Sequence, residues 1–416
     1  MSTDFARAYA AHGPADVNQR TVVVTDGDER AALAVIRSLA AAGYRCVVVS
    51  SSGSSLAGAS RSCARELSVP KAIDAPTEFA RAVAEIVRSE RASLLIPMTE
   101  AAALATLPVR ASFGDCVIPM PDAESFRALS DKQHLLDVAR SIGIATPAQV
   151  SIPDAATGAT FDPSTLPFPV VLKPARSVGE HRGSRVKLSV VHAADAHAFR
   201  RACDALPPAA FPLLVQQRIV GPGVGVFLLR WNDTIHATFA HRRLTEKPPW
   251  GGVSVYRESI APDPDLVARS RALIEQFDWR GVAMVEYKLD AATGRPFLME
   301  VNGRFWGSLQ LAIDAGVDFP RLLASLALGG AGQSPAAFAV GVRSRWWWGE
   351  VDHIVTRMKR RRDAQPLPPG TVSFVRAIGE LLCGPFRARD YEEVFRWSDP
   401  APFLRESLRW FGLKSP

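Results

Sequence analysis

Apolar runs and amphipathic stretches alternate through the first third of the chain. Short runs rich in valine, isoleucine and leucine occur at residues 21–24, 45–50 and 93–98. The stretches between them, near 29–44 and 78–91, have the period of helices with one apolar face. Strands separated by helices of this length are typical of a parallel sheet with crossover helices. We therefore predict an N-terminal α/β domain with a parallel sheet over residues 1–122.

The turn after the first expected strand carries Asp26, Gly27 and Asp28. A dinucleotide-binding domain would begin its G-x-G-x-x-G motif here, because the glycines let the pyrophosphate approach the backbone. That motif is absent from the turn. The pattern therefore disfavours a nicotinamide-dependent enzyme.

The middle third has a different pattern, with more strands and fewer helices. A helix is expected to open at Asp131-Lys132 and to end at Gly143, and the polar segment 151–168 is expected to be a loop. We predict further helices near 195–205 and 264–277, and strands at 170–173, 185–191, 213–219, 224–230, 235–241, 281–289 and 296–302. This content predicts an α+β domain with antiparallel sheets over residues 123–330. For the C-terminal extension, residues 331–416, no fold is predicted.

The most informative segment is residues 281–308, where two strands flank a turn rich in Asp, Thr and Gly. Side chains alternate along a strand, so Glu300, Asn302 and Arg304 are expected on one face. A hairpin centred near Thr293 would bring Glu286 almost opposite Glu300. Like charges facing each other on a sheet are destabilising, so the pair calls for a cation, and oxygen ligands favour a hard one such as Mg²⁺. The alternative is a solvated polar strand face, which the apolar neighbours of these residues disfavour.

The sequence MEVNGRFWGS, preceded by a strand that carries Glu286, resembles the metal-binding signature of the ATP-grasp superfamily. The resemblance extends over roughly residues 20–330, and is closest to the branch of carbamoyl-phosphate-synthase ATP-binding domains, predicted carboligases and D-aspartate ligases. It implies a Rossmann-like pre-ATP-grasp domain followed by two lobes that clasp ATP. It also implies that Glu286, Glu300 and Asn302 bind Mg²⁺, for which Mn²⁺ could substitute, and that Arg304 stabilises the transition state.

Other positions match the family's ATP-binding residues one by one. The resemblance implies phosphate contacts by two lysines and a closing loop, and base contacts by a hinge strand; these residues are Lys132, Lys173, Ser177, Gly179, Gly183, Gln216, Gln217, Arg218 and Ile219. Taken singly, each lysine could equally be a surface residue and the hinge an ordinary buried strand. The segment after the hinge, GPGVGV, lacks the acidic residue that often binds ribose, which leaves the ribose contacts open.

Basic residues are concentrated in the loop region 241–259 and in the tail. Arg243 and Arg257 are candidate contacts for a substrate carboxylate or phosphate, the alternative being a solvated basic loop. In the tail, Trp346–Trp348 could line a pocket, a dimer contact or a membrane surface. The run from Lys359 to Arg362 could be a solvated helix end or a partner contact.

Composition restricts the class of protein. The chain has 416 residues, of which 47% are hydrophobic and 22% charged, and a formal charge of +7 that suits anionic small ligands as well as nucleic acid. Five cysteines lie without metal-ligand spacing, as expected of reduced thiols. Neither a signal peptide nor an apolar run of roughly 18 residues is present. We therefore expect a cytoplasmic protein with no membrane span.

Together these features predict an ATP- and Mg²⁺-dependent ligase that activates a small-molecule carboxylate as an acyl phosphate for attack by an amine. The alternatives are a carboxylase that uses bicarbonate and a non-catalytic ATP-binding module. A nucleic-acid or membrane-surface binder has only the basic run in its favour, so no nucleic-acid partner is expected. A homodimer remains open.

Overall fold

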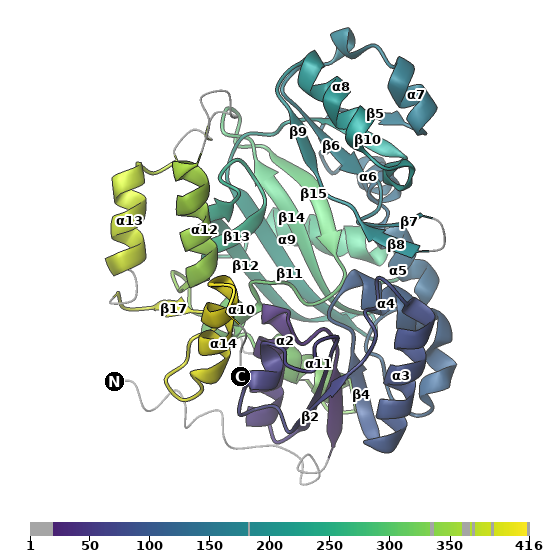
Figure 1. Ribbon diagram of the computed structural model, residues 1–416, viewed down its shortest axis with the longest axis vertical. Helices are drawn as coiled ribbons and strands as arrows, with labels where there is room; N and C mark the ends of the chain where they lie inside the picture. The colour runs from purple at the N-terminus through teal and green to yellow at the C-terminus, as the bar shows by residue number, and fades with distance from the viewer. Residues whose placement is uncertain are drawn as a thin grey trace.

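The computed structural model describes residues 20–181, 184–332, 337–359, 367, 371–383 and 387–413. Figure 1 shows the N-terminal α/β unit at the bottom, a large sheet in the centre, a small lobe at the upper right and C-terminal helices on the left. Gly183 and the basic residues Arg360–Arg362 lie outside the described residues. No helix within the described part of the chain is both long and apolar enough to cross a membrane.

The N-terminal unit contains a parallel sheet in the order β3-β2-β1-β4, which confirms the predicted fold class for this part. Its strands are β1 (Thr21–Val24), β2 (Arg45–Ser50), β3 (Arg65–Ser68) and β4 (Ala92–Ile96), and its crossover helices include α2 (Arg30–Ala41) and α3 (Pro76–Ser89). Edge strand β3 was not predicted from the sequence. Its four residues RELS are half-buried or exposed, so they carry no apolar run that could indicate a strand.

Three helices lead from this sheet into the rest of the chain: α4 (Glu100–Thr106), α5 (Ala123–Ser130) and α6 (Lys132–Ser141). Asp131 caps α6, because its side chain accepts hydrogen bonds from the backbone N–H groups of Gln133 and His134. Lys132 is therefore held in the first turn of a capped helix. That turn faces the small lobe, since the Lys132 backbone N–H donates to the carbonyl of Ala175 at 2.8 Å.

The small lobe has an antiparallel sheet in the order β5-β10-β6-β9. The strands are β5 (Gln149–Ile152), β10 (Leu213–Gln217), β6 (Val170–Pro174) and β9 (Val191–Ala193). A separate hairpin pairs β7 (Val178–His181) with β8 (Ser184–Lys187), and the helices are α7 (Ala155–Thr160) and α8 (Ala196–Ala205). The strand expected at 185–191 is therefore two shorter strands in different sheets, and the expected loop 151–168 contains a short helix.

The large sheet has the order β15-β14-β11-β12-β13-β16-β17. It comprises β11 (Gly223–Trp231), β12 (Thr234–Lys247), β13 (Val253–Ser259), β14 (Gly281–Leu289), β15 (Pro296–Asn302), β16 (Arg343–Arg345) and β17 (Asp390–Glu392). Its neighbouring helices are α9 (Pro264–Glu275), α10 (Leu309–Asp314) and α11 (Phe319–Ala327). All pairings are antiparallel except that of β16 with β17. This sheet confirms the predicted α+β class of the middle of the chain.

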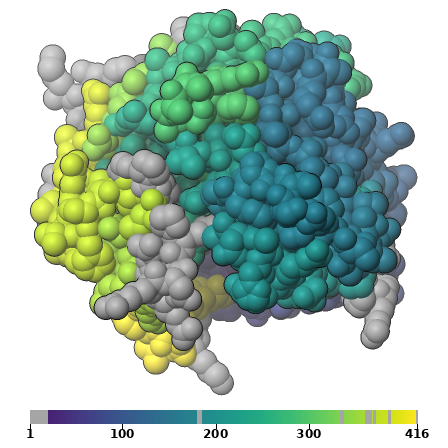
Figure 2. Space-filling model, turned by 90° about the horizontal axis from the view of Figure 1, so that it is seen from above, coloured from purple at the N-terminus to yellow at the C-terminus, as the bar shows by residue number. Residues whose placement is uncertain are grey.

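The C-terminal extension contributes to this sheet as well as to its surroundings. Its strands β16 and β17 form one edge, and its helices are α12 (Trp347–Met358), α13 (Phe374–Cys383) and α14 (Ala401–Trp410). In Figure 1, α12 and α13 lie beside β13, away from the small lobe, and α14 lies near α2; Figure 2 shows the C-terminal residues in yellow and the small lobe in blue to teal at opposite sides of the view. One apolar cluster also joins the two main units, since Val22 and Ile36 share it with Phe227 and Trp306. The N-terminal unit is thus packed firmly against the large sheet.

Candidate functional site

The hairpin of β14 and β15 aligns the candidate metal ligands directly. Glu286 pairs with Glu300, and Met284 pairs with Asn302. The Asn302 amide donates to Glu300 Oε1 at 3.3 Å, so the two side chains are in contact. Only 13% of the Glu286 side chain is exposed. Two carboxylates and an amide therefore converge in a half-buried position, as the alternation along these strands indicated.

Two glycines of β11 lie beside the hairpin. Gly223 pairs with Lys288 and Gly225 with Glu286, and the rings of Phe227 and His241 fill the space over Gly225. The position over Gly223 is left open. The Arg243 side chain from β12 crosses this gap, and a Cβ at position 223 would lie 2.7 Å from its Cδ. Arg243 Nη2 then reaches Glu286 Oε1 at 2.5 Å, and Nη1 donates to Glu246 Oε1 at 3.1 Å.

Charge and burial oppose each other at the carboxylate pair. Burial raises the pKa of Glu286 to about 7, although Arg243 acts against this shift. Burial also disfavours ionisation of Glu300, but Lys132 and Lys173 outweigh it and lower the pKa of that carboxyl. Lys173 is itself desolvated, and burial lowers its pKa to about 8. A hard divalent cation suits the all-oxygen donor set of Glu286, Glu300 and Asn302.

A cavity of about 600 Å³ opens over this floor between the large sheet and the small lobe. Lys173 and the four hinge residues line its small-lobe wall, the latter being Gln216, Gln217, Arg218 and Ile219. Gln216 is 1% exposed; its Nε2 donates to Gln149 Oε1 at 2.8 Å, while its Oε1 has no partner among the described residues. A buried, unpartnered oxygen is a suitable acceptor for an amino group of a ligand.

A second cavity, of about 760 Å³, lies between the large sheet and the N-terminal unit. Glu300, Asn302 and Arg304 line both cavities, so the end of the hairpin is where the two meet. Lys132 enters from the second cavity, and its Nζ donates to Ser177 Oγ at 2.8 Å. Arg304 donates through Nη1 to the carbonyl of Phe305 at 2.9 Å. Lys173 and Lys132 therefore approach the hairpin from two sides.

Two residues singled out from the sequence do not line these cavities. Gly179 is packed against the 3₁₀ turn of the small lobe, since a Cβ there would lie 2.8 Å from the carbonyl oxygen of Ala209. Arg257 is fully buried, pairs with Glu393 through Nη2 and donates through Nη1 to the carbonyl of Ser254 at 2.6 Å. Of the two candidate substrate arginines, the structure therefore brings only Arg243 to the hairpin.

Several cavity residues were not identified from the sequence. Asp26 and Glu100 line the second cavity after β1 and β4, at the carboxyl edge of the parallel sheet. That edge is where ligands bind in open α/β sheets, so the predicted strand ends carried a usable signal for both. Arg30 lines both cavities. Trp346, for which the sequence left a pocket open as one of three possibilities, lines the second. No local signal marked Arg30, because its surroundings come from the C-terminal extension.

Comparisons with known proteins identify the fold. Residues 210–350 match the family model described as "ATP-grasp in the biosynthetic pathway with Ter operon". No curated protein sequence is found to be similar to the chain. Among solved structures, an L-amino acid ligase from Bacillus licheniformis is similar, with a TM-score of 0.60, 16% identity, and 75% of each chain covered.

Two further structures have the same arrangement. The biotin carboxylase domain of Hydrogenobacter thermophilus 2-oxoglutarate carboxylase, a dimer with MgADP and bicarbonate, gives a TM-score of 0.60 at 13% identity, covering 78% of this chain and 73% of that one. N5-carboxyaminoimidazole synthetase from Staphylococcus aureus gives 0.56 at 14% identity, covering 78% and 80%. The chain therefore has the ATP-grasp fold, and the resemblance drawn from the hairpin motif is confirmed at the level of the fold.

Proposed function

We propose that this ATP-grasp protein is an ATP- and Mg²⁺-dependent ligase that activates a carboxylate as an acyl phosphate and joins it to an amine. The observation that carries this proposal is the pairing of Glu286 with Glu300 at the junction of two cavities. Lys173 faces this pair from one cavity and Lys132 from the other. The arrangement suits a polyphosphate chain that ends where a second substrate can reach it.

The nucleotide would occupy the cavity beneath the small lobe. The hinge residues Gln216–Ile219 would contact the base, with the unpartnered Gln216 Oε1 accepting from its amino group. Lys173 and Lys132 would hold the phosphates, and Ser177, hydrogen-bonded to Lys132, would orient that lysine. Gly179 and Gly183 remain candidates for a closing loop only by the resemblance of their segment. The contacts to the ribose stay open.

The carboxylates Glu286 and Glu300, with the Asn302 amide, would hold Mg²⁺, or Mn²⁺ in its place. The ion would supply neutralisation of phosphate charge and alignment of the transferring group. Arg243 would favour the ionised form of Glu286 and orient its carboxylate through their ion pair. Arg304, which lines both cavities, would neutralise charge that develops on the transferring phosphoryl group.

The reaction then needs no covalent intermediate on the protein. A carboxylate oxygen of the acid attacks the γ-phosphorus, so that a C–O–P linkage forms as the bond to ADP breaks. The amine nitrogen attacks the acyl carbon, phosphate leaves and the nitrogen releases a proton. The protein's part is positioning and electrostatic stabilisation by Lys132, Lys173 and Arg304.

A carboxylase that uses bicarbonate is the second candidate. It is favoured by the similarity to a biotin carboxylase domain that binds bicarbonate and to N5-carboxyaminoimidazole synthetase. The similarity to an L-amino acid ligase favours the amide-forming reaction.

A homodimer and a cytoplasmic location belong to the same proposal. The cysteines in the described residues are all free thiols, as expected of a protein in a reducing compartment.

The test is Mg²⁺-dependent release of ADP and phosphate from ATP, screened against pools of amino acids, other carboxylates and bicarbonate. Glu300→Gln serves as the inactive control. Release that requires an acid and an amine together, and disappears in Glu300→Gln, supports the ligase. Release that requires bicarbonate supports the carboxylase instead. Binding of nucleotide without ADP release from any pool would favour a non-catalytic module.

A further inference from the structure

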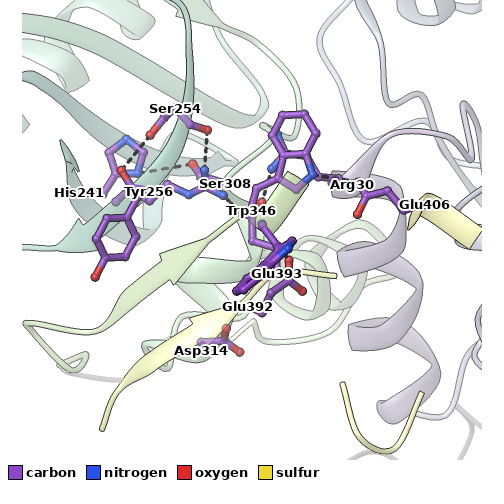
Figure 3. A network of polar contacts seen from close by, with 12 residues as sticks. Arg30, His241, Ser254, Tyr256, Ser308, Asp314, Trp346, Glu392, Glu393 and Glu406 are labelled. Carbon is purple, nitrogen blue, oxygen red and sulfur yellow. Dashed lines mark hydrogen bonds and ion pairs between the residues drawn. The ribbon is translucent and has the colours of Figure 1, made fainter. Parts of the chain in front are cut away.

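Arg30, the first residue of α2, occupies an unusual position between the two cavities. It follows the turn after β1 in the N-terminal unit, and its side chain is only 12% exposed. The guanidinium forms an ion pair with Glu393, from just beyond β17, and lies 3.9 Å from the ring centroid of Trp346. Figure 3 shows these residues gathered where α2, α14 and the large sheet meet. The C-terminal extension therefore fixes an arginine of the N-terminal unit in the site.

Arg30 shares its carboxylate partner with a second arginine. Glu393 is shared by two arginines, because its Oε2 pairs with Arg30 and its Oε1 with Arg257. Arg257 is fully buried, whereas Arg30 lines both cavities. Of these two guanidinium groups, only that of Arg30 borders the cavities.

Three further carboxyl groups act on Arg30, those of Glu29, Glu392 and Glu406. Glu29 is exposed to solvent, which screens its charge. Burial raises the pKa of Glu392, whose carboxylate accepts from the backbone N–H of Trp347. Burial raises the pKa of Glu406 to about 7, so that carboxyl is partly protonated near neutrality; its Oε1 accepts from Trp346 Nε1 at 2.9 Å.

The position of Arg30 also relates it to the reaction centre. A Cβ on Gly307 would lie 3.3 Å from Arg30 Nη2, so the guanidinium lies against the loop that begins at Arg304. Arg304 and Arg30 both line the two cavities, whereas Lys173 lines only the nucleotide cavity. Arg30 thus borders a space next to the hairpin end that the nucleotide would not fill.

We propose that Arg30 binds the carboxylate of the acid substrate, and that the C-terminal segment (the described residues within 337–413) contributes to substrate choice by holding this arginine through Trp346 and Glu393. The proposal rests on the proposed function. A guanidinium presents two parallel N–H groups, which match a carboxylate in a bidentate manner. The Trp346 ring beneath it keeps the guanidinium plane fixed, so less rotamer freedom is lost when the carboxylate binds. The phosphates of ATP are the competing ligand for the same group.

The experiment compares Arg30→Gln with a matched control on the same helix. Arg37 also joins α2 to the C-terminal segment, since its Nε donates to Asp399 Oδ2 at 2.9 Å, but it lines neither cavity. Arg37→Gln therefore weakens the same contact between units and leaves the cavities unchanged. Arg30→Lys, which keeps the charge but not the paired donors, is the second variant if Arg30→Gln does not fold.

Binding is measured by thermal unfolding and tryptophan fluorescence, with pools of L-amino acids and of two- to six-carbon carboxylic acids as probes. The corresponding amides are the uncharged references, and each pool is tested with and without the Mg²⁺ complex of a non-hydrolysable ATP analogue. We expect the wild type to bind an acid but not its amide. Arg30→Gln or Arg30→Lys should weaken that binding about tenfold or more, because a charge-assisted bidentate contact is lost.

Arg37→Gln should bind the acid within about twofold of the wild type, and all variants should bind the ATP analogue equally. Equal loss in Arg30→Gln and Arg37→Gln would show that Arg30 acts only by holding the C-terminal segment, which overturns the proposal. Weaker binding of the ATP analogue alone, or no carboxylate binding by the wild type, also overturns it. The proposed function is judged separately, by binding of the ATP analogue and by ADP release.

Discussion

Arg243 Nη2 contacts Glu286 Oε1 at 2.5 Å, across a row of the sheet where Gly223 leaves no side chain. A guanidinium thus supplies positive charge at one end of a carboxylate pair that would bind a metal ion. Because the Arg243 and Glu286 side chains are only 12% and 13% exposed, the contact is poorly screened by solvent. This ion pair links the stability of the fold to the chemistry of the site.

Arg243→Gln should therefore destabilise the protein, because it leaves a buried carboxylate without its counter-charge. Loss of one partner of a buried ion pair lowers the free energy of unfolding by about 3 kcal/mol or more. Urea unfolding measures the change. Mg²⁺ with ADP should raise the unfolding midpoint less in Arg243→Gln than in the wild type, since Glu286 then lacks the ion pair that favours its ionised form and orients it. An equal response of both proteins would contradict a metal at Glu286.

Gly223→Ala should disturb the contact between Arg243 and Glu286 by placing a methyl group against the arginine side chain. The new Cβ would lie 2.7 Å from Arg243 Cδ, so the arginine must move away from Glu286. We expect about a tenfold loss in affinity for the Mg²⁺ complex of ADP, measured by calorimetry. Gly379→Ala, on α13, is the matched control, because a Cβ there meets nothing within 4 Å. If both variants bind the Mg²⁺ complex of ADP equally well, the absence of a side chain at position 223 has no role in the site.

The raised pKa of Glu286 predicts that the stability of the protein depends on pH in the absence of metal. The pKa of this carboxyl is raised from 4.5 to about 7 on folding, so between these values the folded protein holds more of the proton than the unfolded chain. The contribution of this group to the free energy of unfolding therefore falls as the pH rises from about 4.5 to about 7. Glu286→Gln should show a shallower decline than the wild type over this window, as measured by urea titrations at several pH values.

Mg²⁺ provides the control for this interpretation. An ion bound by the carboxylates favours their ionised form, so it should reduce the difference in slope between wild type and Glu286→Gln. A wild-type slope that is identical to that of Glu286→Gln without metal would mean that Glu286 is not the titrating group.

Glu393→Gln should be far more destabilising than Glu258→Gln, although each carboxylate is shared by two arginines. Arg30 and Arg257 are 12% and 0% exposed beside Glu393, whereas Arg242 and Arg343 are 49% and 38% exposed beside Glu258. We expect a loss of about 3 kcal/mol or more for Glu393→Gln and about 1 kcal/mol or less for Glu258→Gln. Chemical denaturation checks both values. Similar losses would show that the Glu393 cluster is solvated.

The parts of the fold and of the site that depend on residues close together in the sequence could be predicted. The alternation along β15 and the short turn before it were sufficient to bring Glu286, Glu300 and Asn302 together. Arg243 and Arg257 belong to the same basic region, and β12 and β13 even pair them. Their surroundings differ because Arg257 forms an ion pair with Glu393, which belongs to a segment for which no fold was predicted. Contacts between distant segments left no local pattern to find.

The contact between Arg30 and Glu393 has a consequence for biosynthesis. The two residues lie 363 positions apart, so most of the chain leaves the ribosome before Arg30 can meet its partner. The hairpin with Glu286 and Glu300 is completed roughly a hundred residues earlier, and domains generally fold in order from the N-terminus. A nascent chain could therefore close the cavity beneath its small lobe while Arg30 still lacks its partner. If Arg30 has the role proposed above, binding of an acid would have to wait until Glu393 has been translated.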